Sequence, residues 1–193
     1  MPFSDVEKMI DNMPHMRDGQ EFMASYLYQK NHPEYYNKIQ EAIEESIKLA
    51  DTSVSHYYLY DDNFTVDYKI EMLGRIVDIK NMIYDDGNYG EQWLQVIYNH
   101  GALGYLFFQK GDEESSIAFL KKCAELAAKF DKMDRYTEMN SMLFKGRLFD
   151  KNKLGTPFSA ADRMKYLFKE KYPLTNEFKQ TKEFKEIIDI LQQ

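Results

Sequence analysis

HGALGYLFFQKGDEESSIAFLKKCAEL, residues 100–126, is the stretch that decides the fold. Apolar residues recur every three to four positions on both sides of Gly111-Asp112, which predicts two helices joined by a tight turn. We expect these helices at about 89–110 and 113–130. The small residues Gly104, Ser116 and Cys123 allow the two backbones to approach closely. The larger side chains that fill the shared core are Leu103, Phe107 and Leu120.

The same pattern resembles a tetratricopeptide repeat, most clearly over residues 98–130. Leu103-Gly104 match the Leu-Gly pair of the first helix of the repeat, and Gly111 matches the turn. The other matches are Phe107 at the following aromatic position and Ser116, Leu120 and Cys123 at the small, bulky and small positions of the second helix. Two residues depart from the family pattern, because His100 replaces the usual tryptophan and Ser116 the usual alanine. The resemblance implies an all-α fold, a tetratricopeptide-like solenoid of antiparallel helical hairpins.

Helical periodicity also dominates the rest of the chain, and one domain over residues 1–193 is expected. Further helices are predicted after Pro33, over 66–84 and at about 135–148, 159–170 and 180–191. The clearest loop is 150–157. Alternating strand patterns are absent, and residues 57–60 are the one ambiguous aromatic run, so we expect antiparallel helices and no substantial sheet. The buried stripes of the first two of these helices are predicted to be Tyr36, Ile39, Ile43, Ile47 and Ala50, and Ile70, Leu73, Ile76, Val77, Met82 and Ile83.

Composition and charge narrow the class of protein. The 193 residues carry a net charge of -7, which argues against nucleic-acid binding by the whole surface. Residues 145–185 are the exception, with 11 Lys and Arg against 5 Asp and Glu, a net charge of +6. This basic segment is either a solvated face or a docking surface for an acidic partner. No apolar run is long enough to cross a membrane, and the start lacks the features of a secretory signal, so a cytoplasmic protein is expected.

A wider resemblance covers residues 66–193. Several stretches are similar to the C-terminal half of the Xre-family helix-turn-helix transcriptional regulators, in which a tetratricopeptide-like sensor follows a DNA-binding domain. These stretches are 69–75, the repeat described above, Phe130-Asp131, 141–144, Phe178 and 183–188. Residues 1–60 show no helix-turn-helix. The resemblance therefore implies a sensor or interaction half, without direct nucleic-acid binding by this chain.

The sequence contains none of the common catalytic or phosphate-binding motifs, and no enzyme activity, cofactor or metal site is expected. The four histidines have no second histidine at helical spacing. Cys123 is the only cysteine, so neither an internal disulfide nor a zinc set can form. Its position on the apolar face predicts an inert buried thiol. The acidic turns 61–63 and 85–88 lack the spacing of a calcium loop and are interpreted as solvated turns.

A ligand surface follows from the tetratricopeptide-like register, in which the first helix of each repeat lines a concave groove. The residues expected to contact a ligand are Tyr98, Tyr105, Phe108 and Gln109. The alternative for Tyr105 or Phe108 is packing against the preceding helix. Gly101 and Ala102 stand where a clamp for a peptide carboxylate would need charged or amide residues, so a C-terminal carboxylate is not favoured as the ligand.

Three functions remain open. The first is a peptide- or protein-binding regulatory module related to the sensor half of bacterial regulators. The second is a stand-alone scaffold or oligomerisation protein, with a homodimer as one form. The third is an enzyme whose site cannot be recognised in the sequence.

Overall fold

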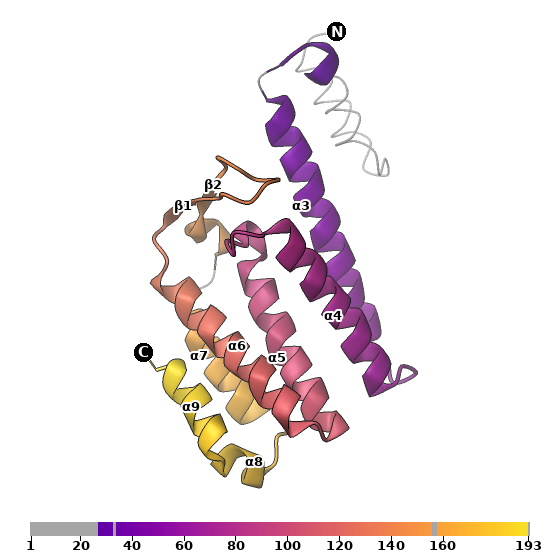
Figure 1. The fold of residues 1–193 in the computed structure, drawn as a ribbon, viewed down its shortest axis with the longest axis vertical. Helices are drawn as coiled ribbons and strands as arrows, with labels where there is room; N and C mark the ends of the chain where they lie inside the picture. Colours follow the sequence, from indigo (N-terminus) through magenta and orange to yellow (C-terminus); the bar gives the residue numbers. More distant parts are fainter. Residues whose placement is uncertain (1–26, 33, 156–157, 193) are drawn as a thin grey trace. The chain divides into compact units, whose positions relative to one another are not determined.

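The computed structural model describes residues 27–32, 34–155 and 158–192 of the chain (Figure 1). Its internal contacts divide the chain into two compact units, 1–51 and 52–193. The described part is predominantly helical, which confirms the expected class, and it also holds one small two-stranded sheet. The organisation of residues 1–193 as a single domain stays a prediction. None of the helices in this described part is long and apolar enough to cross a membrane.

The first unit contains most of helix α3, Tyr35–Ser53. The predicted stripe is only partly buried, because Ile47 is buried while Tyr36 and Ala50 are exposed. The rings of Tyr28, Tyr35 and Tyr36 follow one another at centroid distances of 5.3 and 5.2 Å.

The second unit begins with the π-helical turn η1, Val54–Tyr58, and helix α4, Val66–Ile83. Leu73, Ile76 and Val77 of the predicted stripe are buried, whereas Met82 is exposed. These three buried residues of α4 form one apolar cluster with Val54 and with Leu103 and Leu106 of the next helix.

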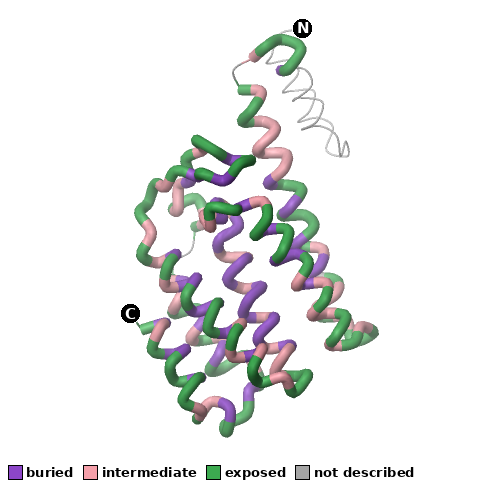
Figure 2. Tube along the Cα trace, in the orientation of Figure 1, coloured by how far each residue is buried: buried purple, intermediate pink, exposed green. Residues whose placement is uncertain are grey.

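A helical hairpin forms the centre of the second unit. The 3-10 turn η2, Gly90–Gln92, leads into α5, Trp93–Lys110, and α6, Glu113–Lys132, follows. The turn between α5 and α6 forms as predicted, since Gly111 adopts a left-handed conformation with φ of 83° and Asp112 caps α6 by accepting from the Ser115 amide. Buried positions run along α5, which packs against both α4 and α6 (Figure 2).

Four shorter helical elements form the C-terminal part of the unit: α7, Ala160–Tyr166; the π-helical turn η4, Leu167–Lys171; α8, Asn176–Gln180; and α9, Lys182–Ile190. The helices predicted at 159–170 and 180–191 are thereby confirmed in outline. Ser159, Thr175 and Thr181 each cap the helix that follows by accepting a backbone amide hydrogen bond. Both α7 and α9 pack against α6 (Figure 1).

The prediction of a helix at 135–148 is wrong, because this segment forms an antiparallel β-hairpin. Strand β1, Tyr136–Glu138, pairs with β2, Leu148–Asp150, so that Thr137 lies opposite Phe149. The 3-10 turn η3, Lys151–Leu154, follows directly within the stretch predicted as a loop. Gly146 takes a φ of 82° in the connection between the strands, a conformation that would end a helix.

Contacts with the loop at residues 85–88, which is distant in the sequence, explain why a β-hairpin replaces the predicted helix. The Asp86 carboxylate accepts hydrogen bonds from the amides of Asn88, at 3.0 Å, and Asn140, at 2.6 Å. The Asn88 side-chain amide donates to the Glu138 carbonyl at 3.3 Å. The Phe144 ring stacks on Tyr84 with centroids 5.1 Å apart. Residues 85–88 therefore anchor the hairpin, and Asp85 and Asp86 remain exposed, as the interpretation of a solvated turn expects.

Candidate functional site

The crossing of α5 and α6 has the register that the sequence predicts. A Cβ atom added at Gly104 would lie 2.6 Å from Leu120 Cγ and 3.1 Å from the Leu120 backbone nitrogen. Leu103, Ser116, Leu120 and Cys123 are all buried at this interface. The close approach of the two helices at Gly104 is thereby confirmed. That the hairpin of α5 and α6 belongs to a tetratricopeptide-like solenoid stays a prediction.

Two titratable groups within this hairpin are buried in their neutral forms. His100 places Nδ1 2.8 Å from the Val96 carbonyl oxygen one helical turn earlier, and burial lowers the pKa of its imidazole. The Cys123 thiol donates to the Ile97 carbonyl at 3.1 Å, and burial raises its pKa far above the usual range. A thiol without thiolate character is a poor nucleophile, so this environment suits packing rather than chemistry.

The four residues predicted to contact a ligand lie on α5 and are paired with side chains of the chain itself. The Tyr105 ring stacks on Tyr172 with centroids 5.1 Å apart, and the Phe108 ring meets Phe178 edge-on at 4.9 Å. These partners follow α5 in the chain, whereas the alternative in the sequence analysis was packing against the preceding helix. The rings of Tyr105 and Phe108 therefore face the C-terminal segment and not an open groove.

Tyr98 and Gln109 lie at the two ends of the same face. The Arg163 guanidinium stands 5.0 Å from the centre of the Tyr98 ring. The Tyr98 hydroxyl is buried and makes no hydrogen bond with the described residues, and its burial raises the pKa. The exposed Gln109 donates to the Tyr105 hydroxyl at 2.9 Å. Of the four, Gln109 is the most accessible to a partner. Ligand contact by this set stays a prediction.

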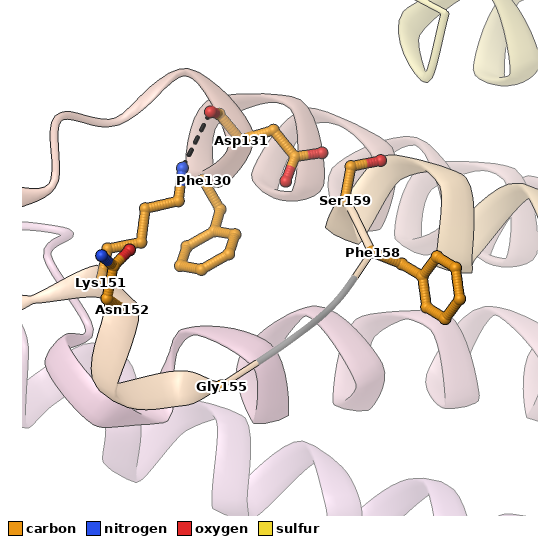
Figure 3. Close-up of a pocket in the computed structure, with 7 residues that line it drawn as sticks. All are labelled: Phe130, Asp131, Lys151, Asn152, Gly155, Phe158 and Ser159. Carbon is orange, nitrogen blue, oxygen red and sulfur yellow. Dashed lines mark hydrogen bonds between the residues drawn. The ribbon is translucent and has the colours of Figure 1, made fainter.

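A cavity of about 560 Å³ lies where α6, η3 and the start of α7 meet (Figure 3). Its polar groups already hold these elements together. Lys151 Nζ donates to the Asp131 carbonyl at 2.8 Å and lies 4.8 Å from the centre of the Phe130 ring. The Asp131 carboxylate accepts from the amides of Ala160 and Ala161, both at 2.8 Å. This cavity is therefore a junction whose lysine and aspartate serve the fold, and no sequence signal links residues so far apart.

A second depression, which we call the C-terminal groove, lies between η4, α8 and α9 and has a volume of about 320 Å³. Phe184 and Ile188 give it an apolar floor. The polar residues of its described lining are Lys169, Lys179, Gln180, Lys185 and Asp189. All three lysines belong to the basic segment 145–185, which the sequence singled out without indicating an apolar surface between them.

Within the described residues, no group of three or more His, Cys, Asp or Glu side chains is arranged to hold a metal ion. Comparison of the chain with protein-family models, with curated proteins and with solved structures found no match.

Proposed function

We propose that this protein is an interaction module that binds a partner protein or peptide through the surface of its C-terminal helices. The observation that carries the proposal is the C-terminal groove, because it combines a buried apolar floor with exposed cationic side chains. Protein-binding surfaces commonly place an apolar centre within a polar rim.

The arrangement of helix pairs supports the same proposal. The hairpin of α5 and α6 is followed by α7 and α9, which both pack on α6, as neighbouring pairs do in a helical repeat array. The resemblance of residues 98–130 to a tetratricopeptide repeat agrees with an array whose role is binding. The resemblance to regulator sensor halves suggests a regulatory partner.

Site-specific photo-crosslinking in the cells that produce the protein tests this proposal. A photoreactive residue is placed at Gln180 in the groove, at Gln109 on the α5 face, or at Lys121 on α6 as a control. All three positions are exposed. We expect a discrete crosslinked partner from position 180 and none from position 121. A partner captured only from position 109 would move the binding surface to α5, as the tetratricopeptide-like register implies.

A scaffold that self-associates is the second candidate function. Exposed apolar residues on the hairpin of β1 and β2 favour it. Met142 is 83% exposed, Leu148 60% and Tyr136 51%. In the crosslinking experiment, a product consisting of two copies of this chain would support this candidate. Equal crosslinking from all three positions, or no product at all, would contradict the proposal of a partner-binding groove.

A further inference from the structure

We propose that the C-terminal groove binds an acidic peptide segment that carries one bulky apolar side chain between carboxylates. This inference rests on the proposed function and names the chemistry of the partner. It depends on three features of the groove: its floor, its rim and its position in the charge distribution of the chain.

The floor is suited to an apolar side chain. Phe184 and Ile188 are four residues apart on α9, so both point to the same side of the helix. They are 3% and 9% exposed, respectively. The volume of about 320 Å³ is at the lower end of the range of ligand pockets. A groove of this size can accept an inserted side chain.

The rim is suited to carboxylates. Lys179 Nζ donates to the Lys169 carbonyl at 2.8 Å, which holds its ammonium group at the groove, and an ammonium has three donors. Lys169 and Lys185 are exposed, and in the part of the chain that the structure describes their side chains form no ion pair. Asp189 is the one acidic residue in the described lining. Charge-assisted hydrogen bonds from such lysines are the expected way to hold an anionic partner.

The position of the groove makes it selective for an acidic segment. The described lining of the groove has three lysines and one aspartate, a net charge of +2, whereas the whole chain has a net charge of -7. An acidic segment is therefore disfavoured by the net charge of the chain and attracted to the lysines of the rim, and such complementarity steers encounter and disfavours wrong partners.

Fluorescence anisotropy with synthetic peptides tests the inference. The probe is a fluorescein-labelled peptide in which one phenylalanine is flanked on both sides by glutamates. One comparison peptide has glutamines instead of the glutamates, and another has alanine instead of the phenylalanine. We expect the full-length protein to bind the probe at physiological ionic strength and to bind each comparison peptide at least about tenfold more weakly, a difference of about 1.4 kcal/mol.

Charge-reversal variants locate the binding. The double variant Lys169→Glu/Lys185→Glu should weaken probe binding by at least about tenfold, since two favourable pairs become repulsive. The control Lys145→Glu/Lys182→Glu has the same change in net charge at exposed positions outside the groove lining, and it should bind within about twofold of wild type. Equal loss in both double variants would show a general charge effect and overturn the inference.

Other outcomes separate this inference from the proposed function. Tight binding of the glutamine peptide, or no binding of the probe by wild type, would overturn the acidic chemistry, while a partner crosslinked at Gln180 would leave the proposed function standing. Anionic lipid vesicles serve as a further probe. If they bind in a way that requires Lys169 and Lys185 while the peptide does not bind, the groove faces a membrane and the inference is wrong.

Discussion

Gly74 and Gly104 occupy similar positions in the interiors of two helices but have very different surroundings. A Cβ atom at Gly74 would meet nothing within 4 Å, whereas one at Gly104 would lie 2.6 Å from Leu120 Cγ. Gly104→Ala should therefore destabilise the protein by about 1–3 kcal/mol through overpacking. Gly74→Ala should stabilise it by about 0.5–1 kcal/mol, because alanine suits a helix interior better than glycine.

Urea denaturation of the two variants measures these free energies of unfolding. Shortening Leu120 in the double variant Gly104→Ala/Leu120→Ala should make the effect of the new methyl group smaller than it is in the wild-type background. If both alanine variants stabilise the protein to the same extent, helices α5 and α6 do not cross closely at Gly104.

The burial of His100 predicts that the free energy of unfolding depends on pH. Burial lowers the pKa of its imidazole in the folded protein below the unfolded value of about 6.5. The unfolded state then binds a proton more readily, so the free energy of unfolding decreases as the pH falls below about 6.5 towards the folded-state pKa. The decrease is about 1.4 kcal/mol for each pH unit between the two pKa values.

Comparison with His100→Gln isolates this contribution, since the carboxylates titrate in both proteins. The stability advantage of wild type over the variant should shrink between pH 7.5 and pH 5, as measured by urea denaturation at each pH. Stability curves that remain parallel over this range would show that His100 accepts a proton as readily in the folded protein as in the unfolded chain.

At the scale of the element, the hairpin of β1 and β2 depends on the loop that anchors it. Asp86 accepts from the Asn140 amide at 2.6 Å, a contact between residues 54 positions apart. Asp86→Ala leaves this amide without its acceptor, so the hairpin should open more often while α5 and α6 remain protected. Hydrogen–deuterium exchange of peptides covering residues 136–150 should then become faster.

Asp62→Ala is the matched control, because Asp62 is an exposed residue in the other acidic turn. This control should leave exchange in the hairpin unchanged. If exchange over residues 136–150 were the same in the Asp86 variant as in wild type, the strands would be held by their own pairing and by the Phe144–Tyr84 stack rather than by the loop.

At the scale of the whole molecule, the charge distribution predicts which partners the protein avoids. With a net charge of -7, the protein should not bind duplex DNA sequence-specifically, because phosphate contacts require a positively charged surface. The basic segment 145–185 makes weak, salt-sensitive association possible, and this should disappear at physiological salt. A sequence-specific mobility shift that persists at physiological salt would contradict the prediction.

The sequence by itself determined most of the described helices and the register of the hairpin of α5 and α6, but not the segment 135–148. Its signals for these features are local: apolar residues at helical spacing, Asp112 as a cap, Gly111 at the turn and Gly104 facing Leu120. Each of these depends on residues close together in the chain or on a repeat pattern, so periodicity and turn chemistry were sufficient to predict them.

Only the tertiary structure decided the hairpin at 136–150, the covering of the α5 face and the groove. The physical reason is the same for all three. Asp86 satisfies the Asn140 amide, Tyr172 stacks on Tyr105, and α9 supplies the apolar floor between lysines that lie on three separate elements. These contacts join residues that no local period connects. At residues 136–150, their free energy outweighs the weak local preference of the segment for a helix.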